Sequence, residues 1–357
     1  MHDRVTRHES AFEFHGTWRD YAPIAFTNLL LTIVTLGIYR FWAKTRERRY
    51  LWSQTRFIDD RLEWTGTGLE LFIGFVLVIV AVGVPVLMLQ FGIQALALRG
   101  LEVVAAIIGI AMYLSFLYLF GLARFRALRY RLSRTSWHGI SGGSDDQGFA
   151  YAVQATWMPI VGGFAGGLLI PWSLVTLWNE KWNAMSFGPH PFTSGASPTP
   201  LFRRLFLCIG LAIAALIGFA AFGFLTANAV QALVPQSPLQ ILLMILPIFY
   251  LLVFVIFPIM FYAAFFRECV SHMTISHLDF GFDARTKDWL KLYAGDVALV
   301  VCTLGIGAIF LGYRHWAFFI GHLEAYGQID LDTLTVSTTA RPGQGEGLLD
   351  AFDIGAI

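Results

Sequence analysis

Charged residues are scarce in this chain: Asp, Glu, Lys and Arg make up 14% of its 357 residues, and hydrophobic residues make up 56%. A soluble globular domain has about 25% charged residues. Together with a mean hydropathy of +0.62, this composition predicts an integral membrane protein. The formal net charge is only +1, and no basic surface interleaved with aromatic residues stands out. We therefore expect no nucleic-acid partner.

Cysteine is also rare. The three cysteines, Cys208, Cys269 and Cys302, lie far apart, so we expect no disulfide framework. The sequence contains no nucleophile elbow, no phosphate-binding loop and no zinc-protease motif. We therefore expect no catalysis, no cofactor and no metal. An enzyme of lipid or envelope metabolism, which would use scattered polar residues in a closed pocket on the inner leaflet, is the third alternative. The first twenty residues lack the short apolar core of a removable signal peptide, and we expect the N-terminus to be retained.

Four apolar stretches are long enough to cross a bilayer. They are Leu69 to Leu89, Val103 to Leu122, Leu205 to Val230 and Leu239 to Phe265. These stretches predict an all-α multi-pass membrane protein. The aromatic alternation at Phe12 to Trp18 and Thr55 to Gly68 adds short β hairpins, which we expect on the cytoplasmic face.

A ten-residue pattern, Arg-x-x-Arg-Tyr-x-x-x-x-Thr, follows an apolar stretch twice. We call the two copies the Arg boxes; a degenerate relative begins at Arg267, with Ser276 at the threonine position. Sliding the chain by 268 positions also aligns Phe12 with Phe280 and Asn28 with Asp296 without a gap. We predict a single membrane domain over residues 1–326, made of three related units at about 12–90, 103–230 and 239–326. A soluble tail is expected over residues 327–357.

Each predicted unit contains an apolar segment interrupted by glycine, at Tyr21 to Trp42, Tyr151 to Trp172 and Trp289 to Leu311. Such a segment either crosses the membrane or enters it and turns back. If all three cross, many Lys and Arg residues face outward, contrary to their usual cytoplasmic excess. Re-entry places nearly all of them inside, so we favour it. Both arrangements place the C-terminus in the cytoplasm.

The string from Asn28 to Ala43, followed by Arg46, Arg49, Tyr50 and Thr55, resembles the YjgN-like family of bacterial inner-membrane proteins. The likeness covers nearly the whole chain, including the Gly-Glu-Gly and Asp-Ala-Phe-Asp motifs near its end. The resemblance implies a multi-pass helical protein of a bacterial inner membrane. It implies no reaction, ligand or catalytic residue, because the family is defined as a domain of unknown function.

Polar residues beside the glycine breaks are candidates for transport or ion binding, since transporters place such sites at broken helices. An ionisable residue in an apolar segment costs at least about 2.5 kcal/mol on insertion scales and suggests function. The candidates are Asp296, Asn28, Thr35, Gly37, Thr303 and Gly305. The structural alternative is that Asp296 lies near the interface and pairs with a neighbouring arginine.

The Arg boxes are candidates for binding anionic lipid headgroups or for anchoring the chain at the interface. The residues concerned are Arg46, Arg49, Tyr50, Arg126, Arg129, Tyr130 and Arg267. These observations favour a transporter-like or lipid-contacting module without catalysis. The alternative is a membrane scaffold that recruits partners through its cytoplasmic Arg boxes and tail. Membrane lipids are the expected partners, and a protein partner or a homo-oligomer stays open.

Overall fold

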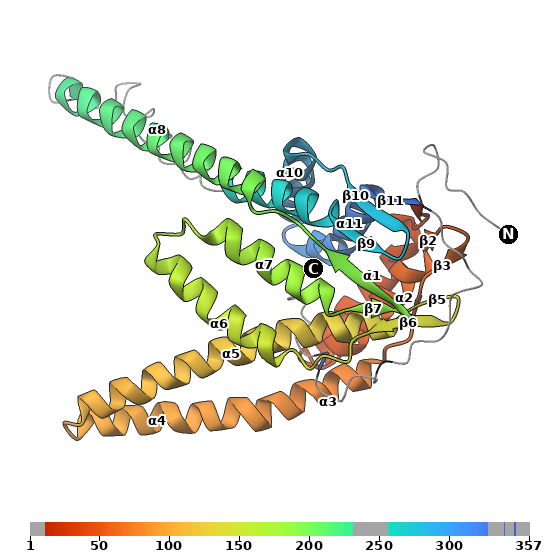
Figure 1. Cartoon of the computed structure of the whole chain (residues 1–357), viewed down its shortest axis with the longest axis horizontal. Helices are drawn as coiled ribbons and strands as arrows, with labels where there is room; N and C mark the ends of the chain where they lie inside the picture. The colour runs from red at the N-terminus through yellow and green to blue at the C-terminus, as the bar shows by residue number, and fades with distance from the viewer. Residues whose placement is uncertain (1–10, 231–255, 328–338, 340–345, 348–357) are drawn as a thin grey trace.

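The computed structural model describes residues 11–230, 256–327, 339 and 346–347. The fourth predicted span therefore lies partly outside the described residues, as does most of the predicted tail. Within the described part, long helices extend to one side and short strands gather at the opposite end (Figure 1). Among the residues that the structure describes, three stretches of helix are long and apolar enough to cross a membrane: Gly68–Leu98, Glu102–Arg134 and Thr199–Ala221.

Two of these stretches form one long helical hairpin. α3 (Gly68–Val78), the π-helical turn η1 (Ile79–Gly83) and α4 (Val84–Leu98) run outward, and α5 (Glu102–Arg134) returns. The 33 residues of α5 rise about 50 Å at ~1.5 Å per residue, which exceeds the ~30 Å hydrocarbon core of a bilayer. The third stretch belongs to α8 (Thr199–Val230), and a helix over residues 256–270 leads back to the strands.

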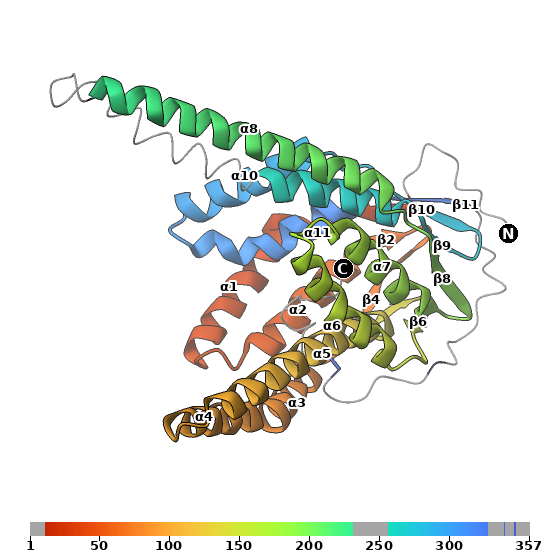
Figure 2. The same cartoon turned by 60° about the vertical axis from the view of Figure 1, so that its left-hand side comes forward.

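The three glycine-broken segments form shorter helical hairpins. They consist of α1 (Trp18–Val34) with α2 (Arg40–Ser53), α6 (Phe149–Phe164) with α7 (Ile170–Asn183), and α10 (Thr286–Cys302) with the 3-10 turn η2 (Ile306–Phe310) and α11 (Leu311–Gly321). In each of them the chain reverses direction at the break (Figure 2). None of the three is a straight helix through the glycine.

The reversals depend on left-handed backbone at the glycines. Gly37 and Gly305 have φ of +91° and +93°, and Gly166 and Gly167 have +62° and +82°. Glycine adopts these angles without the steric penalty that a Cβ brings. A threonine closes two of the turns, because the Thr35 hydroxyl accepts from the Tyr39 N–H at 2.9 Å and the Thr303 hydroxyl accepts from the Gly307 N–H at 2.6 Å.

The strands form an antiparallel meander that connects the helices. β1, β2 and β3 make one small sheet, and β4 to β11 pair in chain order in a second sheet of eight strands. Their bounds are Phe12–Phe14, Thr55–Phe57, Asp60–Arg61, Glu63–Trp64, Thr135–Trp137, Ile140–Gly143, Ser186–Phe187, His190–Ser194, Met273–Ile275, Leu278–Phe282 and Leu323–Gly327. The two ends of the meander approach each other, since the rings of Phe12 and Phe280 lie 6.5 Å apart.

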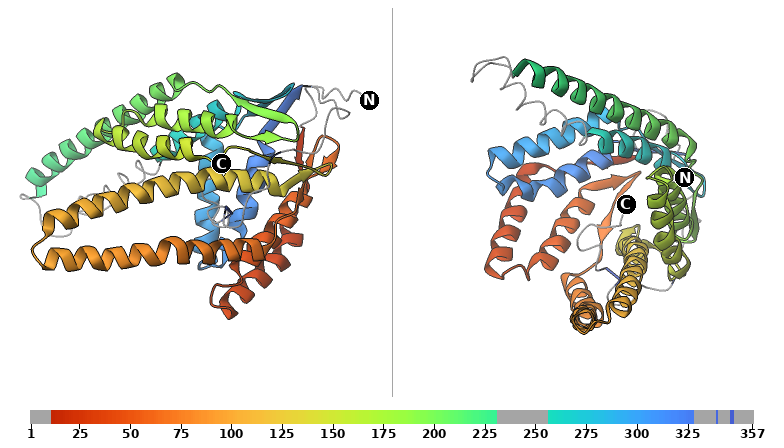
Figure 3. Two further views of the ribbon diagram at one scale, coloured as in Figure 1. Left: turned by 60° about the horizontal axis from the view of Figure 1, so that its bottom comes forward. Right: turned by 90° about the vertical axis from the view of Figure 1, so that its left-hand side faces the viewer.

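The expectation of an all-α protein with isolated hairpins is therefore incomplete. The strand segments are short, two to five residues each, but β4 to β11 pair from one hairpin to the next and form a sheet of eight strands beside the small sheet of β1, β2 and β3. Local alternation predicts a hairpin, whereas pairing between hairpins depends on how the helices place them. Seen from the side to which the long helices extend, the helices are arranged in a ring (Figure 3, right panel).

The hairpin turns also correct one alignment. Two-residue turns with a left-handed first residue occur at Ile58, His138, Gly188 and Ser276. Ser276 is thus equivalent to Ile58, and the residue at the threonine position of the third box is Met273, which begins β9. Arg267 then corresponds to Arg49, the second arginine of the first Arg box.

Candidate functional site

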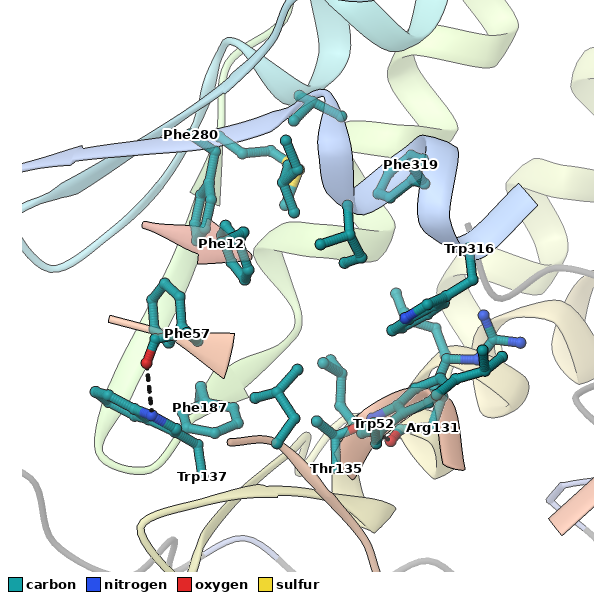
Figure 4. Close-up of a pocket in the computed structure, with 18 of the residues that line it drawn as sticks. Phe12, Trp52, Phe57, Arg131, Thr135, Trp137, Phe187, Phe280, Trp316 and Phe319 are labelled. Carbon is teal, nitrogen blue, oxygen red and sulfur yellow. Dashed lines mark hydrogen bonds between the residues drawn. The ribbon is translucent and has the colours of Figure 1, made fainter. Parts of the chain in front are cut away.

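A cavity of about 800 Å³ lies between the helices and the inner face of the strands (Figure 4). Aromatic side chains from distant parts of the chain line it; those labelled in the figure include Phe12, Trp52, Phe57, Trp137, Phe187, Phe280, Trp316 and Phe319. They come from β1, α2, β2, β5, β7, β10 and α11. We call this space the aromatic cavity.

Three tryptophans of the aromatic cavity donate hydrogen bonds within the protein. The indole N–H of Trp316 donates to Thr55 Oγ1 at 2.9 Å and that of Trp52 donates to Thr135 Oγ1 at 2.9 Å. The indole of Trp137 donates to the carbonyl of Phe57 at 3.1 Å (Figure 4). The threonines of the two Arg boxes therefore tie neighbouring hairpins together.

Three other tryptophans that line the cavity behave differently. The indole nitrogens of Trp178, Trp182 and Trp289 are buried and have no hydrogen-bond partner among the described residues. A buried donor without an acceptor costs ~1–3 kcal/mol. These side chains form one wall. The ring centres of Trp178 and Trp182 are 5.8 Å apart, and the ring centre of Phe266 lies 6.2 Å from that of Trp178 and 5.6 Å from that of Trp289.

Positive charge accompanies the aromatic rings. Lys44, Arg48 and Arg131 line the cavity, whereas Glu47 is the one carboxylate among its described lining residues and pairs with Lys44 at 3.2 Å. Nearby, the ammonium group of Lys181 lies 5.6 Å from the ring centre of Trp178. Burial, followed by the positive charges of Arg124 and Arg131, lowers the pKa of Lys181 to about 7.

Asp296, the ionisable residue predicted for transport, is buried in α10, where it pairs with Arg314 and contacts the imidazole of His315. Its carboxylate accepts from Arg314 Nε at 2.7 Å and lies 2.6 Å from His315 Nε2. Asn28 occupies the matching place in α1, where Arg46 approaches its side-chain oxygen at 3.5 Å. The arginine partner agrees with the structural interpretation of Asp296, and the transport role stays a prediction.

The remaining transport candidates lie away from the cavity. Thr35 and Gly37, like Thr303 and Gly305, build the reversals of α1–α2 and α10–α11. None of the six predicted transport residues is among the described residues that line the aromatic cavity, although His315, the partner of Asp296, is. Asn28 lies close to Arg46, and no hydrogen bond among the described residues joins it to Thr35 or Gly37 at the reversal of α1–α2.

The predicted lipid-contacting residues of the first Arg box bind the chain itself. Arg49 donates to the Gly66 carbonyl at 3.4 Å, and the Tyr50 hydroxyl donates to the Thr17 carbonyl at 2.9 Å. These contacts fix α2 against the neighbouring loops. Binding of lipid headgroups by the box stays a prediction.

The second Arg box has similar internal contacts. Arg126 donates to the Gln147 carbonyl at 3.4 Å, Arg129 donates to the Gln147 side chain at 3.1 Å, and Tyr130 donates to Glu70 at 3.1 Å. Arg129 also pairs with Glu346 of the tail at 3.5 Å, with both side chains almost fully buried. Glu346 and Gly347 of the tail therefore dock on this box. Arg267, by contrast, lines a shallow hollow beside β10.

Sequence reasoning missed the aromatic cavity. One signal was available: Trp178 and Trp182 are four residues apart and therefore share a helix face. The other lining residues come from segments separated by up to about three hundred positions, and nothing local indicates that they meet.

Comparisons with known proteins agree with a membrane family. A family model described as "Bacterial protein of unknown function (DUF898)" matches residues 9–351. The chain is similar to the inner membrane protein YjgN of Escherichia coli O157:H7, 33% identical over 130 residues that cover 36% of this chain and 30% of that protein. The YjgN protein of Escherichia coli K12 is 41% identical over 63 residues, 18% of this chain and 16% of that protein.

A third relative, YjgN of Salmonella typhimurium LT2, is 28% identical over 136 residues, which cover 38% of this chain and 31% of that protein. The chain thus spans less than a third of the length of each of these relatives. No solved structure matches the chain.

Proposed function

Because the chain belongs to the DUF898 family of bacterial proteins of unknown function, and its curated relatives are named inner membrane proteins, we propose that it is an inner-membrane protein that binds a lipid-like molecule without catalysis. The aromatic cavity is the observation that carries this proposal. Its volume of about 800 Å³ falls within the ~300–1,000 Å³ of small-molecule sites. Its mostly aromatic and aliphatic walls suit hydrocarbon.

The hairpin tips support re-entry into the membrane. Leu36 and Leu304 are each 94% exposed, and Phe164 is 90% exposed. Each lies at the reversal of a different hairpin, far from the strands. Large apolar side chains that are exposed at three matching places favour contact with lipid. We therefore propose that α1–α2, α6–α7 and α10–α11 enter the bilayer from the strand side and turn back within it.

The charges support a cytoplasmic position for the strands. Both Arg boxes lie next to strands, since Arg49 precedes β2 and Arg129 precedes β5, whereas the far turn of the α4–α5 hairpin carries only Arg99. A cytoplasmic excess of Lys and Arg is the common arrangement in inner-membrane proteins. In this orientation Glu346 and the tail that carries it are cytoplasmic.

Cysteine accessibility tests the orientation. Single cysteines at Gly100 and Asp283, in a background without the three native cysteines, would be labelled in intact cells with a membrane-impermeant maleimide. We expect labelling at 100 from outside and labelling at 283 only after the membrane is opened. Labelling of position 283 in intact cells would contradict the re-entrant arrangement.

Lipid binding is tested by filling the cavity. The protein would be purified in mild detergent, and the lipid that co-purifies would be quantified by mass spectrometry per mole of protein. Leu132→Phe and Ile275→Phe add volume at partly buried lining positions and should reduce retained lipid several-fold. Ile110→Phe, on the lipid-facing side of α5 where Ile110 is exposed, is the matched control and should leave it unchanged. Equal retention in all proteins would refute the cavity as the binding site.

A scaffold role is the second proposal, and the tail contact bears on it. Because Glu346 and Gly347 already contact Arg129 and Tyr130, a partner of the second Arg box would have to displace the tail. Deletion of residues 328–357 should then change partner recovery from cross-linked membranes while insertion is unaffected. Unchanged recovery would count against the scaffold.

A further inference from the structure

The unpaired indoles raise the question of what the aromatic cavity binds. Three of its tryptophans donate to protein oxygens, as described above, while the indole N–H groups of Trp178, Trp182 and Trp289 have no acceptor among the described residues. Trp178 itself is only 4% exposed. Six similar side chains line one space, and the unpaired ones all belong to one wall, made by α7, the helix over residues 256–270 and α10.

The position of Trp182 explains why its donor has no partner. Trp52 lies three residues before the threonine position of its own hairpin, and it donates to Thr135 at the start of the next hairpin. Trp182 lies three residues before Met185, and the residue that starts the next hairpin is Met273. A thioether is a weak hydrogen-bond acceptor. The replacement of threonine by methionine therefore removes the internal acceptor and leaves the buried indole donor without a protein partner among the described residues.

The charges near this wall indicate the sign of the ligand. Arg131 lines the cavity, and its positive charge, together with that of Arg124, reaches Lys181, whose ammonium group stacks on Trp178. Burial first, and then repulsion by these cations, lowers the pKa of Lys181. An anion in this part of the cavity would relieve the repulsion and would accept from the indoles.

We propose that the aromatic cavity binds an anionic amphiphile, with its carboxylate or phosphate oxygens on the indoles of Trp178 and Trp182 near Arg131 and its hydrocarbon along the remaining aromatic walls. This inference rests on the proposed lipid-binding function and specifies the ligand class. A small inorganic anion would leave most of the apolar lining in contact with water.

Matched ligand pairs test the headgroup. Delipidated protein in detergent would be titrated with oleic acid and oleyl alcohol, and with dioleoylphosphatidic acid and dioleoylglycerol, using native mass spectrometry or displacement of a fluorescent lipid. We expect the acidic member of at least one pair to bind ten-fold or more tightly than its neutral partner. The pair that discriminates identifies the headgroup as carboxylate or phosphate. Inorganic phosphate at millimolar concentration should not displace the fluorescent lipid.

Variants test the residues. Trp178→Phe and Trp182→Phe keep an aromatic ring and remove the N–H, and each should reduce the acidic-over-neutral preference about five-fold or more. Arg131→Met should have the same effect. The matched control is Trp64→Phe, which also removes a buried indole N–H without a partner among the described residues but does not line the cavity, and its preference should equal that of the unaltered protein.

The outcomes separate the two proposals. Equal binding of acidic and neutral ligands, with no effect of the tryptophan variants, would overturn the anionic assignment and leave lipid binding in place. No binding of any amphiphile would overturn both. Displacement by inorganic phosphate as effective as by the acidic lipids would show that the hydrocarbon is not recognised and would also overturn this inference. If a variant fails to fold, the ligand pairs on the unaltered protein still decide it.

Discussion

A double-mutant cycle can test whether Asp296 serves mainly as the structural partner of Arg314 or as an ion site for transport. Its carboxylate lies 2.7 Å from Arg314 Nε and 2.6 Å from His315 Nε2, and its side chain is 9% exposed. Asp296→Asn preserves the shape of the side chain and removes its charge. The amide oxygen can still accept one hydrogen bond from Arg314, in the way that Asn28 is approached by Arg46.

The expected loss follows from the exposure of the partners. Removing one member of a buried ion pair costs ~3–5 kcal/mol. Here the Arg314 and His315 side chains are 34% and 45% exposed, so solvent compensates part of their lost interaction. We expect Asp296→Asn to lower the free energy of unfolding by roughly 1–2 kcal/mol, between the values of buried and surface pairs.

The assay is equilibrium unfolding in mixed micelles, followed by tryptophan fluorescence. Arg314→Met and the double variant complete the cycle, and we expect a coupling free energy of about 1 kcal/mol or more. Asp283→Asn is the control, because Asp283 is exposed. Additive losses, with no coupling between positions 296 and 314, would refute the structural pair and would favour the ion-site interpretation of Asp296.

Three further predictions concern other buried contacts. Lys181 has a pKa of about 7 in the folded protein, below its ordinary 10.5. Between these two pH values the unfolded chain binds more protons than the folded protein, so the free energy of unfolding rises with pH. In chemical unfolding from pH 7 to pH 9, the protein should gain roughly 2–3 kcal/mol relative to Lys181→Met. Glu346→Gln should leave Arg129 buried without its carboxylate and speed limited proteolysis of the tail several-fold; an unchanged cleavage rate would contradict docking. Trp52→Phe should lower the free energy of unfolding by about 1 kcal/mol, because Thr135 loses the indole donor; no change in chemical unfolding would show that this bond contributes nothing.

The helical part of the fold could be predicted because its signals are local. The stretches Leu69 to Leu89 and Val103 to Leu122 lie within the described helices, and the glycines of the broken segments coincide with reversals. A run of apolar residues and a glycine each act on their immediate neighbours. The three-unit repeat and its domain limits stay predictions, although Asn28–Arg46 and Asp296–Arg314 make related contacts 268 positions apart.

The sheet and the aromatic cavity could not be predicted in the same way. Each strand has at most five residues, which is too few to specify which hairpin will be its neighbour. The ten-residue spacing from Arg267 predicts Ser276 at the threonine position of the Arg boxes, whereas the turn geometry places Met273 there. That error concealed the site, because the methionine at this position is the reason that the indole of Trp182 lacks an acceptor.

The Arg boxes combine two roles that the sequence presents as one motif. Their threonines accept indole donors from other hairpins, and Arg49 and Tyr50 bind nearby backbone, so these positions hold the hairpins around the cavity. At α7 and at the start of β9 the equivalent positions carry Trp182 and Met273, and no such bond forms among the described residues. The departures from the Arg-box pattern therefore lie where the cavity wall has unpaired donors. Met273→Thr should supply an acceptor for the indole N–H of Trp182, as Thr135 does for Trp52. The variant should therefore have a higher free energy of unfolding and bind the acidic amphiphile more weakly. If it binds the amphiphile more tightly while it is also more stable, the indole of Trp182 does not hold the ligand.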